Sequence, residues 1–392
     1  MNLQKEIHDY VLAHQDEIIA TWKDIVDTPS KVNQRDDLNA CCDKLIALFE
    51  GIDFEVEKHD VGPVNGPAFS GILGKDRPGK PVMFSGHYDT VPLAGDHPFR
   101  YDEEGHVRGL GSLDMKGGIT IAYHICKMLN ELGWAERPIK ILFLGDEEKG
   151  HVDGTAVEVM QKLAPGALCD FNMETGLVSN AICVGRKGTI ITKMTIHGIG
   201  AHSGNDFQSG RSAIAEAAHK IPMIEALTNL NKQTTVATTL IEGGTVMNSI
   251  PPICKLTVDS RIFRLDERER ILAAMKEIAA DTFIEGCSTE YTCEEYMPPF
   301  EPNEKNHILA GFVSDISEEL GWGKMDTVTL GGGSDASHIT IAGVPTICSI
   351  GVRGQFNHTE KEYALKESIF ERTELLANAV VRIDEFAARL GE

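Results

Sequence analysis

The sequence lacks any long hydrophobic segment. No apolar run approaches the roughly 18 consecutive residues that a membrane-spanning helix requires. The first ten residues, MNLQKEIHDY, are polar and have no hydrophobic centre of the kind found in a signal peptide. We therefore expect a cytoplasmic protein that does not bind membranes.

Positive charge is also scarce. The chain has 37 Lys and Arg residues against 59 Asp and Glu residues, which gives a formal net charge of −22. Nucleic acids and anionic membranes bind to basic patches, so this balance argues against both as partners. It also means that an anionic substrate requires a local positive site.

A disulfide framework is not expected either. The nine cysteines are scattered and no Cys-x-x-Cys pair occurs, which favours buried free thiols in a reducing compartment. With 392 residues, 42% hydrophobic residues and 38 glycines, the composition fits a compact α/β enzyme long enough for two domains.

The motifs of three common enzyme classes are missing as well. GLGSLD begins like a dinucleotide-binding loop but lacks the third glycine and a suitably placed acidic residue. GGSDA lacks the last glycine of the G-x-S-x-G motif of serine hydrolases, and no base is evident. H-E-x-x-H is absent, which excludes a single-zinc protease of that kind.

Short apolar runs alternate with helical segments between residues 54 and 185. Buried strands are predicted at PVMFSGHYD (81–89), IKILFLGD (139–146) and LCDFNMET (168–175), and a helix at 115–133. This alternation predicts a largely parallel sheet that is covered on both faces. The same pattern returns after residue 300.

The segment between these two parts follows a different pattern. From residue 187 the predicted order is strand, helix, strand, strand, helix, strand, which is typical of a ferredoxin-like fold. The predicted fold class is therefore α/β, with an inserted ferredoxin-like α+β domain. We place the boundaries at 1–186, 187–298 and 299–392, so that the first and last parts form one domain.

Side chains suited to metal binding follow three of the predicted strands. His87 and Asp89 end the first strand, the acidic residues 146–148 follow the second, and Glu174 follows the third. Ligands of open α/β sheets bind beyond the carboxyl ends of the strands. We therefore expect these side chains to gather at one edge of the sheet.

Asp114 in GLGSLDMKGG and His358 in GQFNHTEKEY are two further candidates, both in loops. Histidines and carboxylates together make a nitrogen and oxygen site suited to zinc. Several neighbouring carboxylates repel one another and resist burial, and a bound divalent cation makes them tolerable. The combination predicts a metal site.

Seven motifs resemble, in order, those of the dizinc metallopeptidase family: SGHYDTVP, GLGSLDMKGG, LFLGDEEKG, METG, GIGAHSG, GGGSDA and NHTEKEY. That family includes the bacterial glutamate carboxypeptidases, aminoacylase, acetylornithine deacetylase, succinyl-diaminopimelate desuccinylase and peptidase T. The resemblance covers nearly the whole chain and is greatest to glutamate carboxypeptidase. It implies a catalytic domain and an inserted lid domain through which the protein forms a homodimer.

The resemblance implies two Zn²⁺ ions per subunit, for which Co²⁺ or Mn²⁺ can substitute. His87 and Glu174 would bind one ion, and Glu148 and His358 would bind the other. Asp114 would bridge the two ions.

Other residues of these motifs would act without binding metal. Asp89 would hold the His87 ring in place, and Glu147 would be the general base. Three carboxylate ligands and one bridging hydroxide balance two ions, which leaves Glu147 free to take and return a proton. Asp146 would be structural, through hydrogen bonds. The resemblance also implies a cis peptide bond before Met115.

Four residues are predicted to contact the substrate by the same resemblance. His202 would reach across from the other subunit to stabilise the oxyanion, and Arg261 would bind a substrate carboxylate. Asn248 matches a residue that contacts substrate, and Gly333 would present a backbone N–H group. A turn histidine, a surface arginine and a simple glycine turn are the alternatives.

The predicted function is hydrolysis of an amide bond next to a free carboxylate in a small peptide or an N-acyl amino acid. A glutamate carboxypeptidase is favoured, and an N-acyl-amino-acid deacylase or a dipeptidase stays open, because Arg261 does not separate them. A non-catalytic dimeric binding protein is a remote alternative, since Glu147 and all five ligand positions are present.

Overall fold

The computed structural model describes residues 3–391 and divides into two compact units. The first unit comprises Met1–Gly185, Pro302–Thr329 and Ser334–Glu392, and the second comprises Arg186–Glu301 and Leu330–Gly333. The predicted boundaries put Leu330–Gly333 in the same domain as the first part of the chain, which corresponds to the first unit. The segment joins the second unit because Leu330 accepts a backbone hydrogen bond from Lys187 (3.0 Å) and Gly333 accepts one from the Arg186 side chain (3.1 Å).

A six-stranded sheet forms the centre of the first unit. Its strands are β1 (Glu55–His59), β2 (Gly66–Leu73), β3 (Val82–His87), β6 (Ile139–Gly145), β7 (Cys169–Asn172) and β17 (Thr346–Ile347). Their order is β1-β2-β6-β3-β7-β17. The pairs β6–β3, β3–β7 and β7–β17 are parallel, whereas β1–β2 and β2–β6 are antiparallel. The predicted largely parallel sheet is confirmed.

Side chains of the central strands alternate between two hydrophobic cores. Phe84 and Phe143 belong to the larger core, whereas their neighbours Met83 and Leu142 belong to the smaller one. Successive residues of a strand point to opposite faces of the sheet, so the two cores lie on its two faces. Burial on both faces explains why these strands are continuous apolar runs in the sequence.

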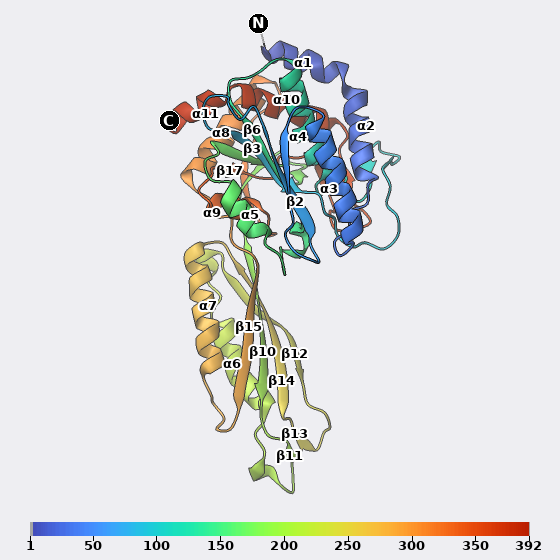
Figure 1. Cartoon of the computed structure of the whole chain (residues 1–392). Helices are drawn as coiled ribbons and strands as arrows, with labels where there is room; N and C mark the ends of the chain where they lie inside the picture. Colours follow the sequence, from blue (N-terminus) through green and yellow to red (C-terminus); the bar gives the residue numbers. More distant parts are fainter. Residues whose placement is uncertain (1–2, 392) are drawn as a thin grey trace. The chain divides into compact units, whose positions relative to one another are not determined.

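Helices cover both faces of this sheet (Figure 1). Those that contribute to the larger core are α1 (Leu3–Ala13), α2 (Gln15–Val26), α3 (Arg35–Glu50), α4 (Lys116–Glu131), α8 (Glu304–Glu319), α10 (Glu367–Val381) and α11 (Ile383–Arg389). Those of the smaller core are α5 (Ala156–Leu163) and α9 (Ala336–Ile341). Among residues 3–391, no helix has both the length and the apolar composition needed to cross a membrane.

Short strands complete the first unit. A five-stranded sheet has the order β4-β5-β19-β18-β8, formed by β4 (Arg100–Tyr101), β5 (Val107–Arg108), β19 (Tyr363–Ala364), β18 (Arg353–Gln355) and β8 (Gly176–Leu177). A further pair is formed by β9 (Ile182–Arg186) and β16 (Thr327–Leu330), whose last residues, Arg186 and Leu330, already belong to the second unit. The loop between β18 and β19 carries His358, so the five-stranded sheet positions this residue.

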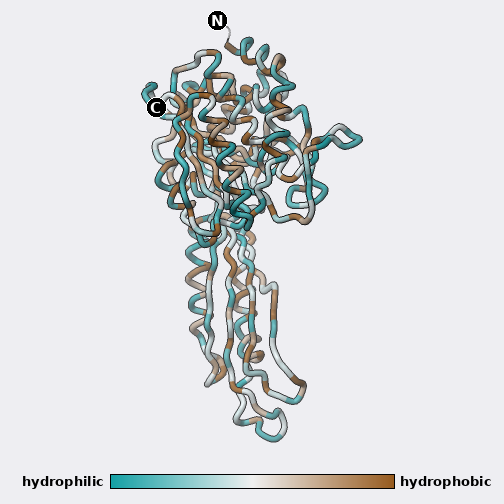
Figure 2. Tube along the Cα trace, turned by 45° about the vertical axis from the view of Figure 1, so that its right-hand side comes forward, coloured by the Kyte–Doolittle hydropathy of each residue, from teal (hydrophilic) through white to brown (hydrophobic). Residues whose placement is uncertain are grey.

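The second unit has the predicted β-α-β-β-α-β order. Its elements are β10 (Gly188–His197), α6 (Ala213–Glu225), β12 (Thr235–Gly243), β14 (Ile253–Ile262), α7 (Leu265–Ala280) and β15 (Ser288–Met297). The strands form an antiparallel sheet of order β12-β14-β10-β15. Hydrophobic and hydrophilic residues alternate along these strands (Figure 2), and the hydrophobic ones pack on α6 and α7. The ferredoxin-like α+β fold is confirmed.

Both units also contain small elements that were not expected from the sequence. In the second unit, β11 (Ala201–His202) and β13 (Ser249–Ile250) form a two-stranded sheet. Three single turns of 3₁₀ helix are η1 (Glu147–Lys149), η2 (Phe207–Ser209) and η3 (Leu230–Lys232).

A buried carboxylate connects α7 to the segment before β12. Glu267 accepts hydrogen bonds from Thr234 Oγ1 (2.9 Å), Lys232 Nζ (2.9 Å) and Arg270 Nε (3.0 Å). The hydrogen bond from Arg270 is the largest influence on this group, and together these contacts lower the pKa of Glu267 from 4.5 to about 2.

We predict that Glu267→Gln destabilises the second unit at neutral pH. Because the pKa of Glu267 is lower in the folded chain than in the unfolded chain, its contribution is complete above pH 4.5 and is lost as the pH falls toward 2. A lowering from 4.5 to about 2 corresponds to about 3 kcal/mol at pH 7. Urea unfolding of wild type and variant between pH 7 and pH 3 measures this difference.

Glu277→Gln is the matched control, because Glu277 is an exposed glutamate on the same helix. It should unfold like the wild type at every pH. A Glu267→Gln destabilisation that is the same at pH 7 and pH 3 would contradict the assignment of a charged, paired carboxylate.

Candidate metal centre

The parallel strands bring the predicted ligands to one edge of the sheet. Because β3, β6 and β7 are parallel neighbours, their carboxyl ends lie side by side. His87 is the last residue of β3, Glu147 and Glu148 begin the turn η1 after β6, and Glu174 follows β7. The sheet therefore delivers these side chains from three different strands.

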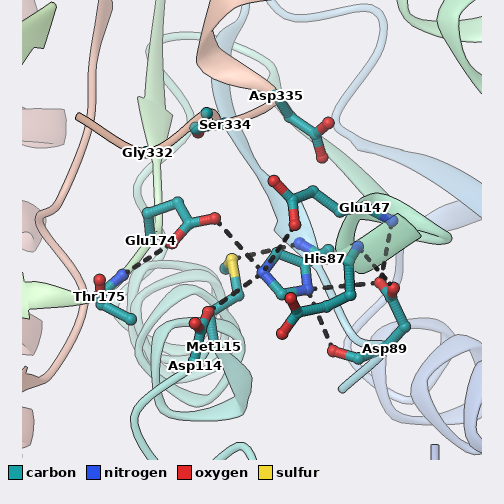
Figure 3. A network of polar contacts seen from close by, with 12 residues as sticks. His87, Asp89, Asp114, Met115, Glu147, Glu174, Thr175, Gly332, Ser334 and Asp335 are labelled. Carbon is teal, nitrogen blue, oxygen red and sulfur yellow. Dashed lines mark hydrogen bonds and ion pairs between the residues drawn. The ribbon is translucent and has the colours of Figure 1, made fainter. Parts of the chain in front are cut away.

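His87 is the centre of the first group of side chains (Figure 3). Its Nε2 atom lies 3.3 Å from Asp114 Oδ1, 3.3 Å from Glu174 Oε1 and 3.9 Å from Glu147 Oε2. On the other side of the ring, Nδ1 lies 3.1 Å from the backbone oxygen of Asp89 and 3.3 Å from its Oδ1. Asp89 thus orients the ring so that Nε2 faces the carboxylates.

His358 forms a second group that shares Asp114 with the first. Asp114 Oδ2 lies 3.0 Å from His358 Nε2, and the same nitrogen lies 3.0 Å from Glu148 Oε2. Asp114 therefore directs one oxygen at each histidine, as a bridging ligand would. Asn357, which the sequence analysis missed, donates a hydrogen bond to Asp114 Oδ2 at 2.8 Å.

The donor atoms at this edge fit divalent metal ions. Among the described residues, the buried atoms His87 Nε2, Asp114 Oδ1 and Glu148 Oε1 have no hydrogen-bond partner. Unpaired buried polar atoms are unfavourable unless a ligand satisfies them. Donor atoms of His87, Asp114 and Glu148 lie within 4.8 Å of one another, and so do those of His87, Glu147 and Glu174. Two adjacent groups of nitrogen and oxygen donors suit zinc and similar ions.

Burial gives the carboxylates of this site unusual acidities. It raises the pKa of Glu147 well above 4.5; His87 opposes this effect, and the charges of Glu174 and Asp335 add to it. Burial and the charge of Asp114 raise the pKa of Glu148 to about 7. A carboxylate with a raised pKa can accept and return a proton near neutral pH.

Asp89 has a second function that the sequence analysis did not find. Its Oδ1 and Oδ2 atoms accept hydrogen bonds from the backbone N–H groups of Glu147 (3.3 Å) and Glu148 (2.9 Å). The residue that orients His87 therefore also fixes the start of the turn η1. The two partners are 58 and 59 residues away in the sequence, so no local motif indicates this contact.

Two smaller predictions are confirmed. Asp146 is fully buried and accepts a hydrogen bond from Asn65 Nδ2 at 2.7 Å, which agrees with its predicted structural role. The peptide bond between Asp114 and Met115 is cis.

His202 and Asn248 lie together in the second unit. His202 is exposed on β11, and its Nδ1 atom accepts hydrogen bonds from the N–H groups of Gly204 (3.1 Å) and Asn205 (3.0 Å). This places the proton of the neutral ring on Nε2, where it can be donated. The backbone oxygen of Asn248 accepts a hydrogen bond from Ser203 at 2.9 Å, beside His202.

Arg261 lies at the opposite end of the sheet, near the last residue of β14. Its Nε and Nη2 atoms donate to the two carboxylate oxygens of Asp259 (2.9 and 3.1 Å), and Nη1 donates to Thr189 Oγ1 (2.7 Å). Ten residues of extended strand separate this end from the β11–β13 pair by on the order of 30 Å. One copy of the unit therefore does not bring Arg261 and His202 together.

Gly333 is at the same end of the second unit as Arg261. Thr189 pairs with Arg261 on one side and with Met297 on the other. A Cβ atom at Gly333 would lie 2.7 Å from Met297 Cγ, so the absence of a side chain allows this close approach. The carbonyl oxygen of Gly333 accepts the hydrogen bond from Arg186 described above.

Comparison with known proteins assigns the family. Residues 83–382 match the model of "Peptidase family M20/M25/M40". The chain belongs to this peptidase family. The resemblance inferred from the seven motifs is thereby confirmed, and this member of the M20 family is a metal-dependent hydrolase of peptide or acyl amide bonds.

Its relatives include both peptidases and a deacylase. Carboxypeptidase G2 of Pseudomonas sp. (strain RS-16) is 26% identical over 374 residues, which cover 94% of this chain and 89% of that protein. Succinyl-diaminopimelate desuccinylase 2 of Ruegeria sp. (strain TM1040) is 28% identical over 348 residues, which cover 81% and 84%. Aminopeptidase PepT from Bacillus cereus ATCC 10987 shares the fold, with a TM-score of 0.78, 21% identity and coverage of 93% and 97%.

We predict that metal binding to this M20 enzyme releases protons. In the absence of metal, the hydrogen bonds of His358 to Asp114 and Glu148 raise its pKa to about 11, so the ring is protonated at pH 7. A metal ion on Nε2 must displace that proton. The affinity for the metal ion should therefore fall about tenfold for each unit by which the pH is lowered and for each proton displaced. Calorimetry in buffers of different ionisation enthalpy counts the released protons.

The His358→Ala variant should release fewer protons than the wild type. His307→Ala is the control, because His307 is exposed on α8 and makes no contact with the site. Equal proton release by wild type and His358→Ala would show that His358 is not a ligand.

Proposed function

We propose that this enzyme is a dizinc exopeptidase that cleaves an amide bond next to a free carboxylate, as a glutamate carboxypeptidase does. One observation carries the proposal: Asp114 lies between two histidines, and each histidine has a further carboxylate beside it. In this assignment His87 and Glu174 would hold one ion, Glu148 and His358 would hold the other, and Asp114 would contribute one carboxylate oxygen to each. Co²⁺ or Mn²⁺ can replace Zn²⁺, since the donors are nitrogen and oxygen.

The chain's own residues supply the proton transfers. Bound divalent ions lower the pKa of a water molecule and polarise the scissile carbonyl group. Glu147 takes the proton of the attacking water and gives a proton to the leaving amine. Its Oε2 atom lies 3.9 Å from His87 Nε2, beside the donor atoms that would hold the ions. Asp89 keeps both His87 and the turn with Glu147 in position.

His202 and Arg261 are proposed to act on one substrate from two copies of the chain. The Nε2–H group of His202 would donate to the developing oxyanion, and Arg261 would bind the substrate carboxylate. The two residues are at opposite ends of the second unit, so both can act on one substrate only if a second copy contributes one of them. Asn248 would act beside His202, and Gly333 beside Arg261.

The homodimer is proposed to form through the second unit. Strand β12 is the last strand of its sheet, so one of its edges has no partner strand within the described chain. Leu240 and Ile241 on this strand are large apolar residues that are more than half exposed. An exposed apolar edge strand is a surface on which a second chain can add.

The substrates are proposed to be small peptides or N-acyl amino acids rather than nucleic acids or membrane components, in keeping with the net charge of −22. A cytoplasmic location is proposed because all nine cysteines are free thiols. N-acyl-amino-acid deacylation is the second candidate, and the similarity to a succinyl-diaminopimelate desuccinylase favours it. Hydrolysis of acylated glutamates, N-acetyl and N-succinyl amino acids and dipeptides, each with Zn²⁺, Co²⁺ or Mn²⁺, distinguishes the candidates.

We predict that Glu147→Gln retains two metal ions and loses about 10²–10⁴-fold in kcat, the usual contribution of a general base. Metal analysis and steady-state kinetics on the best substrate of the panel measure both effects. Glu158→Gln, an exposed glutamate on the nearby helix α5, is the control and should keep wild-type kcat. Wild-type turnover by Glu147→Gln would disprove its role as the base.

We predict that two inactive variants restore activity when they are mixed. Glu147→Gln lacks the base and His202→Ala lacks the oxyanion donor, but a mixed dimer has one complete site if His202 acts across the interface. Random exchange of subunits should restore about a quarter of the wild-type sites, because half of the dimers are mixed and each has one complete site. Activity that stays at the level of the separate variants would show that His202 acts within its own chain or not at all.

A further inference from the structure

A buried histidine near the proposed site has no part in the mechanism described above. His151 lies in the loop after η1, and its Nδ1 atom is 2.8 Å from Asp146 Oδ1. Its Nε2 atom is 2.7 Å from Asp335 Oδ1. Both ring nitrogens thus face a carboxylate oxygen, which makes the ring an imidazolium that donates a hydrogen bond on each side.

The two carboxylates belong to different parts of the first unit. Asp146 follows β6 and directly precedes the turn that carries Glu147 and Glu148. Asp335 precedes α9, 184 residues from His151 in the sequence, and its side chain points toward Glu147 (Figure 3). The His151 ring therefore connects two elements: the turn η1, which carries Glu147, and the start of helix α9.

The backbone of this loop is held in an unusual conformation. His151 has a φ of 59°, in the left-handed region that non-glycine residues seldom adopt. The His151 N–H group donates to the backbone oxygen of Asp146 at 3.1 Å, and the Gly154 N–H group donates to the backbone oxygen of His151 at 3.2 Å. Asn65 Nδ2 links the same two segments, with hydrogen bonds to Asp146 Oδ2 (2.7 Å) and Val152 O (3.2 Å).

The positive charge of the His151 ring compensates two buried carboxylates. Asp146, His151 and Asp335 are each at most 4% exposed. A buried carboxylate without a positive partner is strongly unfavourable, and here two of them flank the turn that carries Glu147. Without the ring, Asp146 and Asp335 would repel each other and Glu147, and the turn would move.

We propose that His151 is a positioning residue for hydrolysis. By bridging Asp146 and Asp335 it ties the turn with Glu147 and Glu148 to the start of α9. This inference rests on the proposed function, in which Glu147 is the base and Glu148 a ligand.

The test compares His151→Gln, Asp335→Asn and the double variant with the wild type. A glutamine presents one amide donor and one carbonyl oxygen, so it can hold one carboxylate but repels the other. We expect His151→Gln to lower kcat at least tenfold while KM changes less than twofold. The double variant should lose no more than His151→Gln alone, because the second carboxylate is already neutral.

A second readout does not depend on turnover. The visible absorption spectrum of the Co²⁺-loaded protein reports the coordination of the ions and should change in His151→Gln, because Glu148 is on the same turn. Asp153→Asn is the matched control: Asp153 is an exposed residue of the same loop with a φ of 61°, a conformation that asparagine tolerates. It should keep both kcat and the cobalt spectrum, and thermal unfolding verifies that each variant is folded.

Two results would overturn the inference. One is a folded His151→Gln variant with kcat within twofold of wild type and an unchanged cobalt spectrum, which would limit His151 to stability. The other is a double variant whose loss equals the product of the two single losses, which would show that His151 and Asp335 act separately. If the wild type hydrolyses none of the amides tested, the proposed function fails, and the cobalt spectra still decide the role of His151.

Discussion

The crowding of carboxylates around His87 is the constraint on which the rest of this structure depends. Asp114, Glu147 and Glu174 all have an oxygen within 3.9 Å of a single ring nitrogen, and all are largely buried. One histidine does not compensate so much negative charge at a site that is shielded from water. Divalent ions do, and the buried nitrogen and oxygen atoms of the site that make no hydrogen bond are those that such ions would bind.

The two units place their candidate functional residues in different ways. The first unit gathers its side chains by topology, because parallel strands end at one edge and each end carries a polar residue. The second unit instead keeps its functional candidates apart, with His202 at one end of an antiparallel sheet and Arg261 at the other. One copy of this unit does not bring both residues to one substrate, and the proposed function therefore requires a second copy of the chain.

The sequence predicts those parts of the molecule that local patterns encode. Apolar runs located β3, β6 and β7, and the change of pattern located the second unit. The motifs identified the four residues whose carboxylate oxygens lie within 3.9 Å of the His87 ring nitrogens, namely Asp89, Asp114, Glu147 and Glu174. Contacts between distant segments were missed, because no local pattern records them. Asp89 caps the turn η1, Asn357 supports Asp114, and His151 bridges to Asp335 over 184 residues. The very short strands around the His358 loop were missed because strands of two or three residues have no periodicity to detect.

The most direct test of the central claim is the metal content of the purified enzyme together with its stability after chelation. The account predicts two divalent ions per chain, and a fall in the melting temperature when a chelator removes them, because the buried carboxylates then lose their partners. Re-addition of Zn²⁺ should restore the melting temperature. A chain that binds no divalent ions, or one that melts at the same temperature with and without them, would contradict the account.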